Sequence, residues 1–405
     1  MSLSRVLGSF FVVSASLLVL ACDPVPAPIS SGLAVGVARS CVIAAPPQVV
    51  DAGVGSDAGS GSGATLTTGG PLYCWGDGDL RAVPTQLSIS DAVQVSLGEP
   101  NCVLRLRGSV SCWGENSAGE VGDGTTEARP DARAVPGLVD AVQVATSRFR
   151  STGSAFGGTR AGPGFACAVR ARGVVSCWGA NDAGQLGDGS TTERHLPTIV
   201  TGIEPALAVA LGARHACALV AGEVFCWGAN DRGQLGNSNL ADSPRPVRVQ
   251  GVEQATAIAL GEAHSCALLA TGEVMCWGRN DLAQLGQGSV GADGSVPRLV
   301  LGLSGATRIA AGANHSCVAT AEGVLCWGAD DQDQTGVPGN GPQVQPGISR
   351  QLAPVSELSA GAAHTCVVTA GEFRQVFCWG ANDLGQLGGG DTQPSSFPRS
   401  VYSVP

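Results

Sequence analysis

Short runs of alternating apolar and polar residues recur along the chain from about residue 30 onward. Residues 206–211 and 224–227 have this period-2 pattern, which is typical of half-buried β-strands. The segment AGE at 221–223 lies between two such runs and is typical of a hairpin turn. Pro244 and Pro246 suit an outer edge strand, where a missing backbone donor faces solvent. The pattern predicts units of about four strands without a helix.

The unit recurs seven times. All seven tryptophans lie in the tripeptide Cys-Trp-Gly, at separations of 38, 65, 49, 50, 50 and 52 residues. They are Trp75, Trp113, Trp178, Trp227, Trp277, Trp327 and Trp379. One four-stranded sheet cannot bury both of its faces alone, but seven sheets arranged radially cover one another. We therefore predict an all-β, seven-bladed β-propeller of four-stranded blades over residues 31–405.

A turn motif recurs in several units and characterises the repeat. Asn followed three residues later by Gly-Gln-Leu-Gly occurs at Asn181, Asn230 and Asn382, after H-x-C and V-x-C-W-G segments in the fullest units. This pattern resembles the repeat of the regulator of chromosome condensation family over most of residues 31–405, and the resemblance implies a seven-bladed propeller. Departures from the pattern occur at residues 77–80 (DGDL), at Glu120-Val121 and at Gln334-Thr335.

The two ends of the chain predict how the ring closes. Residues 31–41 correspond to the stretch that leads into the first cysteine of a unit, and residues 397–404 correspond to the last strand of a unit. The chain thus ends where it begins within the repeat. We predict a ring closed by N- and C-terminal strands, with one blade that contains strands from both ends, because such closure leaves no exposed sheet edge.

Fifteen cysteines divide into Cys22 and two for each of the seven units. In every unit the two lie on adjacent strands of one hairpin, where opposed Cβ atoms are about 4.5–5.5 Å apart, close to disulfide geometry. The predicted disulfides join Cys41 with Cys74, Cys102 with Cys112, Cys167 with Cys177, Cys217 with Cys226, Cys266 with Cys276, Cys317 with Cys326, and Cys366 with Cys378. The alternatives are reduced core cysteines and a metal or redox use, although C-x-x-C zinc spacing is absent.

Four histidines hold the same place in four successive units, whereas Arg39 and Phe165 stand there in others; they are His215, His264, His315 and His364. A ring of imidazoles could bind a metal in the central channel, but replacement by Phe165 argues against a metal requirement. The family resemblance implies instead that each histidine is hydrogen-bonded to a neighbouring turn. We predict no catalytic residue, no metal and no cofactor.

The N-terminus is typical of a bacterial signal peptide over residues 1–21, with an apolar run of 15 residues that is short for a membrane span. The segment VLAC at 19–22 resembles a lipobox, in which the cysteine becomes lipid-modified. Residues 22–30, with three prolines, then form a short stiff tether. We expect a lipid anchor on Cys22 in the bacterial cell envelope, in either membrane. Cleavage to a secreted protein is the alternative, and both compartments permit disulfides.

The charge balance excludes several functions. The net charge is −10, and all 23 basic residues are arginine. An acidic chain without a basic run lacks the electrostatic footprint of nucleic-acid binding, and the absence of lysine excludes lysine chemistry. Guanine nucleotide exchange with chromatin binding, the family's best-known activity, does not carry over, since no functional residue can be matched.

Two inserts interrupt the repeat, at residues 46–70 and 146–164. The first is a low-complexity loop rich in Gly and Ser. The second carries the arginines Arg148, Arg150 and Arg160 with Phe149 and Phe156, and such a loop on a rigid scaffold suits a binding surface. An insertion without function is the alternative.

These observations predict a monomeric, non-enzymatic scaffold that presents propeller loops to an envelope or extracellular protein, or to a carbohydrate. A secreted inhibitor of an enzyme is one alternative. A propeller hydrolase or lyase is another, and it would need a non-repeating Asp/Glu/His cluster on one face. His195, outside the repeated position, is the one candidate histidine for it.

Overall fold

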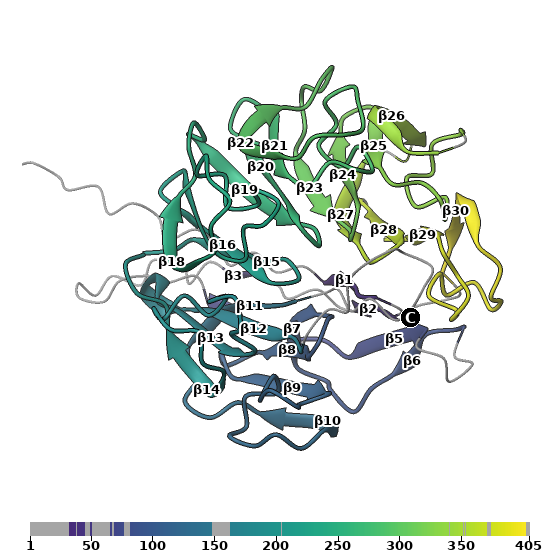
Figure 1. Ribbon diagram of the computed structural model, residues 1–405. Coiled ribbons are helices and arrows are strands. Elements are labelled where there is room, and N and C mark those ends of the chain that lie inside the picture. Colours follow the sequence, from purple (N-terminus) through teal and green to yellow (C-terminus); the bar gives the residue numbers. More distant parts are fainter. Residues whose placement is uncertain are drawn as a thin grey trace, which may run out of the picture.

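The computed structural model of the protein describes residues 32–37, 39–44, 49–50, 65–66, 69–76, 82–147, 163–203, 205–339, 341–350, 352, 354–370 and 374–401. Their strands form seven four-stranded antiparallel sheets and one two-stranded sheet. The seven larger sheets are the blades of a ring (Figure 1). The predicted all-β, seven-bladed propeller is confirmed.

Each blade takes four strands in chain order, from the innermost to the outermost. The first blade consists of β1 (Leu33–Val35), β2 (Arg39–Ile43), β5 (Leu72–Gly76) and β6 (Thr85–Gln86), and the second of β7 (Ala92–Ser96), β8 (Asn101–Arg105), β9 (Val110–Gly114) and β10 (Arg129–Ala134). The third consists of β11 (Ala141–Thr146), β12 (Phe165–Arg170), β13 (Val175–Gly179) and β14 (Arg194–Ile199), with a 3₁₀ turn, η1 (Ala171–Gly173). The fourth consists of β15 (Ala208–Leu211), β16 (His215–Val220), β17 (Glu223–Gly228) and β18 (Ser243–Arg248).

The fifth blade consists of β19 (Ala255–Leu260), β20 (His264–Leu269), β21 (Val274–Gly278) and β22 (Gly294–Leu299). The sixth consists of β23 (Arg308–Ala311), β24 (His315–Thr320), β25 (Gly323–Gly328) and β26 (Gln343–Arg350), and the seventh of β27 (Val355–Ala360), β28 (His364–Thr369), β29 (Val376–Gly380) and β30 (Ser395–Ser400). The first insert contains a short hairpin of β3 (Val49–Val50) and β4 (Thr65–Leu66), where the sequence predicts a loop. Among the described residues, no helix is long and apolar enough to cross a membrane.

The antiparallel order places the connecting loops on two faces of the ring. Loops from the first to the second strand and from the third to the fourth strand of a blade lie on one face, called the cleft face below. Loops from the second to the third strand, and from one blade to the next, lie on the other face, called the opposite face. The insert at 146–164 connects β11 to β12 and therefore belongs to the cleft face, whereas the insert at 46–70 connects β2 to β5 on the opposite face.

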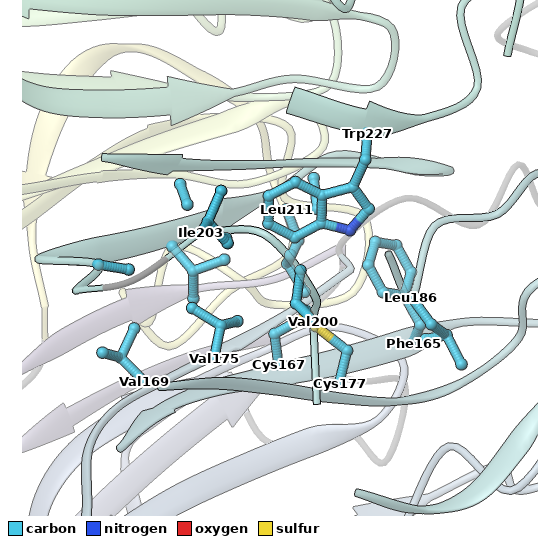
Figure 2. Packing of buried hydrophobic residues seen from close by; sticks show 14 residues of the cluster. Phe165, Cys167, Val169, Val175, Cys177, Leu186, Val200, Ile203, Leu211 and Trp227 are labelled. Atoms are coloured by element: carbon cyan, nitrogen blue, oxygen red, sulfur yellow. A yellow bond between two sulfur atoms is a disulfide. The ribbon is translucent and has the colours of Figure 1, made fainter. Parts of the chain in front are cut away.

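The core lies between blades. Trp227 of the fourth blade is fully buried and packs over Phe165, Val200 and the Cys167–Cys177 disulfide of the third blade (Figure 2). Burying an indole removes about 150–250 Å² from water, worth about 5 kcal/mol of transfer free energy. The same packing recurs between successive blades, so tryptophan is the residue that joins each blade to the one before it.

Five of the indoles are also held by a hydrogen bond to the turn of the preceding blade; they are those of Trp75, Trp178, Trp227, Trp277 and Trp327. The buried Trp379 Nε1 has no such partner among the described residues. Trp227 Nε1 donates to the Gln185 carbonyl at 2.9 Å, and Asn181 Oδ1 in the same turn accepts from the Leu186 amide at 2.9 Å. Gly187 closes this turn at φ 67°, and a Cβ there would lie 2.8 Å from Trp227 Nε1. The Asn-x-x-Gly-Gln-Leu-Gly motif is thus the socket for the next blade's tryptophan, and its last glycine permits the close approach.

The seven expected cysteine pairs are the seven disulfides of the structure, with Cα–Cα distances of 4.0–4.2 Å. The two cysteines of each pair are directly opposed on the second and third strands of their blade, and the first pair keeps this register across 33 residues because the insert at 46–70 only lengthens the loop. In blade order, the structure bonds Cys41 to Cys74, Cys102 to Cys112, Cys167 to Cys177, Cys217 to Cys226, Cys266 to Cys276, Cys317 to Cys326, and Cys366 to Cys378. The pairing predicted from the sequence therefore holds in every blade, and the reduced and metal-binding alternatives do not apply to these fourteen cysteines.

The ring closes between N- and C-terminal strands, but the expectation of one blade with strands from both ends is wrong. The first and seventh blades each take all four strands from their own part of the chain. The joint between them uses the contacts of the joints from the fourth to the fifth and from the fifth to the sixth blade: Trp75 Nε1 donates to the Gln386 carbonyl at 2.8 Å, and His364 Nε2 lies 3.0 Å from Ser40 Oγ. Leu33 N donates to Glu357 at 2.7 Å across the same joint. Because these contacts already join the two blades, no strand needs to be shared.

Candidate functional site

A cleft of about 720 Å³ opens on the cleft face where the first, second and seventh blades meet. Arg39 and Gly36 line it from the first blade, and Glu99 with Glu115 from the second. Asp383 contributes from the seventh blade. Gln332 of the sixth blade also lines it. The site is asymmetric because it belongs to four of the seven blades, and an asymmetric constellation is what selective binding needs.

The cleft lies where one repeated contact is missing. In the last four blades the residue two before the first cysteine is histidine, and its ring is fully buried. Each histidine Nε2 meets a hydroxyl of the next blade at 2.9–3.0 Å; the pairs are His215–Ser265, His264–Ser316, His315–Thr365 and His364–Ser40. The equivalent residues of the first three blades are Arg39, Pro100 and Phe165, and the first two of these line the cleft.

The hydrogen bonds of the four histidines indicate a structural role, because they join neighbouring blades. The Ser265 hydroxyl donates to the Gln234 carbonyl at 3.0 Å, so its oxygen accepts from the Nε2–H of His215. The predicted hydrogen bond to a turn thus runs through a hydroxyl of the next blade. Burial lowers the pKa of each of the four imidazoles to about 3, so they are neutral at pH 7. Within the described residues, no group of three or more His, Cys, Asp or Glu could hold a metal ion.

The second blade carries a buried acid where the third to seventh blades have glutamine. Glu120 is 1% exposed and stands where the motif has glutamine. Its carboxylate accepts from the Ala118 amide at 2.8 Å and from the backbone of Gly164. Burial is the largest cause that raises the pKa of Glu120, and Glu115 adds repulsion. In the third blade, the motif glutamine Gln185 donates to Asp182. The second blade has Glu120 in place of this glutamine and Ser117 in place of this aspartate. The exchange of both residues avoids two adjacent carboxylates.

The insert at 146–164 begins and ends beside the cleft. Ser147 O accepts from the Glu99 amide at 2.8 Å, and Ser147 Oγ donates to the Glu99 carbonyl at 3.0 Å. Gly164, at the other end, meets Glu120. The five predicted binding residues, Arg148, Phe149, Arg150, Phe156 and Arg160, lie outside the described residues, as does Cys22. Both ends of the insert are therefore fixed to the second blade next to Glu99.

The two faces differ strongly in charge. Among the described residues, the loops of the cleft face carry eighteen carboxylates and three arginines, whereas those of the opposite face carry five carboxylates and three arginines. The acidic residues of the cleft-face loops are Glu99, Glu115, Glu120, Asp123, Glu127, Asp182, Asp188, Glu193, Asp231, Asp242, Glu262, Asp281, Asp293, Asp330, Asp331, Asp333, Asp383 and Asp391. Summed charge of one sign over a surface steers partners of the other sign.

Two carboxylates of the cleft have no cationic partner among the residues that the structure describes. Asp182 of the third blade pairs with Arg214 at 2.6 Å, but the equivalent Asp383 accepts only from Gln386 Nε2, at 3.0 Å. Glu115 is exposed and makes no hydrogen bond or ion pair with a described residue. Arg129 also lines the cleft, but its guanidinium forms an ion pair with Asp123 at 2.7 Å. The cleft therefore offers unneutralised negative charge at its rim.

The central channel is narrower, with a cavity of about 170 Å³ lined by the innermost strands. Gln143 bridges two of these strands, since its Oε1 accepts from the Val209 amide at 2.8 Å and its Nε2 donates to the Val209 carbonyl at 3.1 Å. His195 lies in the outer strand β14, with Nε2 3.1 Å from Glu193 Oε1. It lines neither the channel nor the cleft, so the structure does not bring this candidate to the acidic site.

Comparison with known proteins decides the family. The RCC1-like domain family matches residues 153–405, more than half of the chain. The chain belongs to this family. The matched range holds β12 to β30, which are the third blade without its first strand and the fourth to seventh blades. The first two blades, which line the cleft, precede it. RCC1-like propellers are scaffolds of the protein-interaction type.

Three known proteins are similar to this chain, one in sequence and two in structure. Human HERC2, an E3 ubiquitin-protein ligase, is 29% identical over 179 residues, which are 40% of this chain and 3% of HERC2. The chain thus spans a small part of that protein's length. Human WBSCR16 superposes with a TM-score of 0.67 at 21% identity over 80% of this chain and 85% of its own. The structure of yeast RCC1 (Prp20) bound to Kap60 superposes with a TM-score of 0.69 at 20% identity over 82% of this chain and 83% of its own. The two structures share the fold.

The sequence does not predict the cleft, although it carries a signal for it. Arg39 and Pro100 break the histidine pattern in neighbouring units, and Glu120 breaks the glutamine pattern. Departures that gather in consecutive repeats mark one sector of a ring. Asp383 could not be found this way, because its repeat is intact and only the neighbouring blade differs.

Proposed function

We propose that the protein is a non-enzymatic, lipid-anchored scaffold of the bacterial cell envelope that binds a basic partner protein on its cleft face. The observation that carries this proposal is the coincidence of three irregular features in one sector. The cleft is lined by the sixth, seventh, first and second blades and carries the unpaired carboxylates, and both ends of the longest cleft-face insert lie next to it on the third blade. The described residues of the fourth and fifth blades carry none of these features.

The chemistry of the cleft favours a protein with exposed Arg or Lys. Glu115 and Asp383 present negative charge at the rim, on a face where carboxylates far outnumber arginines. Among the described residues, no aromatic side chain lines the cleft for a sugar ring to stack on. Protein binding also suits the fold family, since Prp20 binds Kap60. A basic protein therefore fits better than the carbohydrate that the sequence leaves open.

The anchor rests on the sequence. Cys22 ends a segment typical of a lipoprotein signal, and Gly32, the first described residue, lies ten positions after it. Seven disulfides suit an oxidising compartment outside the cytoplasm. Mass spectrometry of the mature N-terminus tests this part: a diacylglyceryl-modified Cys22 is expected, and an unmodified N-terminus would contradict the anchor while leaving the binding proposal intact.

Affinity capture from envelope extract tests the binding. The purified mature chain is compared with a cleft variant that combines Glu115→Arg and Asp383→Arg, with a deletion of 148–162, and with Glu322→Arg on the opposite face as the matched control. We expect one or more basic proteins whose recovery falls at least tenfold with the cleft variant and with increasing salt, but not with the control. Equal recovery with the cleft variant and with wild type would contradict the site.

The captured partner also separates the two remaining alternatives. If it is an enzyme whose rate falls on titration with this chain, the scaffold is an inhibitor. The hydrolase or lyase alternative has one observation in its favour, three carboxylates in one cleft: Glu99, Glu115 and Asp383. It lacks a histidine among the lining residues. Turnover of a glycan or peptide library that Glu115→Gln abolishes would replace the binding proposal with that one.

A further inference from the structure

Hydrogen bonds hold the first described residues, Gly32 and Leu33, in place on the propeller. The Gly32 carbonyl accepts from the Ile43 amide at 2.7 Å, and the Leu33 amide donates to Glu357 at 2.7 Å. Since Gly36 and Val37, which follow β1, line the cleft, β1 starts at the opposite face and runs toward the cleft face. β1 is the innermost strand of its blade, and Leu33 lines the channel. The N-terminal segment therefore meets the propeller on the opposite face, close to the central axis.

The tether is too short to pass around the ring. Ten residues from Cys22 to Gly32 span at most about 33–36 Å when fully extended. A path outward across four strands covers about 14 Å, and a path along a six-residue outer strand covers about another 20 Å. Such a path ends where the long loops of the cleft face, such as residues 115–128, begin. A lipid on Cys22 thus cannot bring the cleft face onto the same membrane.

Electrostatics favours the same orientation. In the part of the chain that the structure describes, loops of the cleft face carry eighteen carboxylates against three arginines, and those of the opposite face five against three. A leaflet with anionic lipids repels the first surface more strongly, within about one Debye length. Arg107 and Arg172 lie exposed on the opposite face, in turns that follow the second strands of their blades. Neither makes an ion pair with a described residue, so both are available to phosphate groups.

We propose that the opposite face lies on the membrane that holds the lipid and that the cleft face is presented away from it. The inference rests on the proposed anchor. It restricts the partner to a basic protein that approaches from the side away from the membrane: a soluble protein, or one carried by a facing membrane. A partner embedded in the anchoring membrane cannot reach the cleft.

The absence of lysine gives a sharp test. Arg107→Lys on the opposite face and Arg232→Lys on the cleft face each create the one side-chain amine of the chain and keep the charge. The lipidated full chains are bound to vesicles of phosphatidylethanolamine and phosphatidylglycerol, which are treated with a short amine-to-amine cross-linker. Mass spectrometry then counts phosphatidylethanolamine adducts on each lysine. Cys22→Ser versions in solution, treated with a soluble amine reagent, show that both lysines are equally accessible.

We expect adducts on Lys at position 107 to exceed those on Lys at position 232 by at least tenfold, and Arg172→Lys to behave like Arg107→Lys. Chains that float with the vesicles but give equal adducts on the two faces, or more on the cleft face, would overturn the orientation and leave the anchor standing. Chains that carry no lipid and do not float would overturn the anchor, and the orientation with it.

Discussion

The last four blades and the first three are built on the same sheets and the same disulfides, but they differ in how each blade is joined to the next. From the fourth blade onward, a buried histidine and a hydroxyl of the next blade supplement the tryptophan socket at every joint. In the first three blades that pair is absent, and the cleft and the long insert occupy this sector. The family match, which begins at residue 153, covers the regular part and leaves out the first two blades.

The two partners of a joint change together. Where the third blade has Phe165 in place of histidine, the fourth has Ala216 in place of the hydroxyl residue, and the two belong to one apolar cluster. A buried hydroxyl without its partner costs about 1–3 kcal/mol, so a change on one blade favours a change on the next. The difference teaches that joints can exchange polar for apolar contacts in pairs, while the disulfides hold the sheets and leave the cleft-face loops free to diverge.

The largest expected effect comes from removing the last strand. Deleting residues 392–405 removes β30, exposes the edge of β29, and takes Val401 from the cluster around Trp75 that joins the seventh blade to the first. We expect an insoluble chain, or a melting temperature at least about 10 °C lower by circular dichroism, which corresponds to several kcal/mol.

The contrasting deletion is in the irregular part. Replacing residues 148–162 by two glycines keeps Ser147 and Gly164 and their bonds to the second blade. We expect its melting temperature within about 2 °C of the wild type. If the insert deletion destabilised the chain as much as loss of β30, the insert would be part of the framework and the contrast between the two regions would fail.

Acid should unfold the regular part first. Each imidazole has an ordinary pKa of 6.5 in the unfolded chain and about 3 in the folded chain, because burial disfavours its charged form. The unfolded state therefore binds more protons between these values, and stability is complete above pH 6.5 and falls as the pH drops toward 3. Each histidine costs about 1.4 kcal/mol per pH unit in this window. Urea midpoints measured from pH 7.5 to 4 under non-reducing conditions test the slope.

Carboxylates give a separate contribution at lower pH. Hydrogen bonds from Ser190 with an ion pair to Arg194 lower the pKa of Asp188, and the Arg279 ion pair does so for Asp281. Their stabilisation is present above the ordinary value of 3.8 and is lost below it. A slope that starts only below pH 4 would therefore show that the histidines do not control acid stability.

The sequence predicts the blade but not the joint or the cleft. Strands, hairpins and cysteine pairs follow from period-2 patterns within about twenty residues, so their prediction needs no knowledge of the ring. His264 and Ser316 are 52 residues apart and meet only when blades stack, and Asp383 and Glu115 line one cleft only when the ring closes. The prediction of one blade with strands from both chain ends fails because it also depends on contacts between blades. Trp75 and Ser40 both donate to the Gln386 carbonyl in the turn of the seventh blade, so the first blade joins the seventh without an exchanged strand.

A substitution at one joint tests whether the polar pair is replaceable. His264→Ala removes a fully buried ring and leaves the Ser316 hydroxyl without its partner, so we expect a loss of about 2–4 kcal/mol in urea unfolding at pH 7.5. The double variant with His264→Phe and Ser316→Ala copies the Phe165–Ala216 joint. It should lose less than the single variant and should shift the acid transition to lower pH. A double variant no better than His264→Ala would mean that the two joints are not interchangeable.

The smallest expected effect is in the second blade and has the opposite pH dependence. Burial raises the pKa of Glu120, so the folded chain holds this proton more tightly than the unfolded chain, and the acid stabilises only at low pH, losing that contribution as the pH rises through its raised pKa. Glu120→Gln restores the residue of the repeat, and its side-chain oxygen can still accept from the Ala118 amide. We expect a gain of up to about 1 kcal/mol at pH 7.5 that disappears toward pH 4. A pH-independent loss would show instead that the charged carboxylate is needed to hold Gly164, and that the irregular sector, like the regular one, depends on a specific buried polar contact.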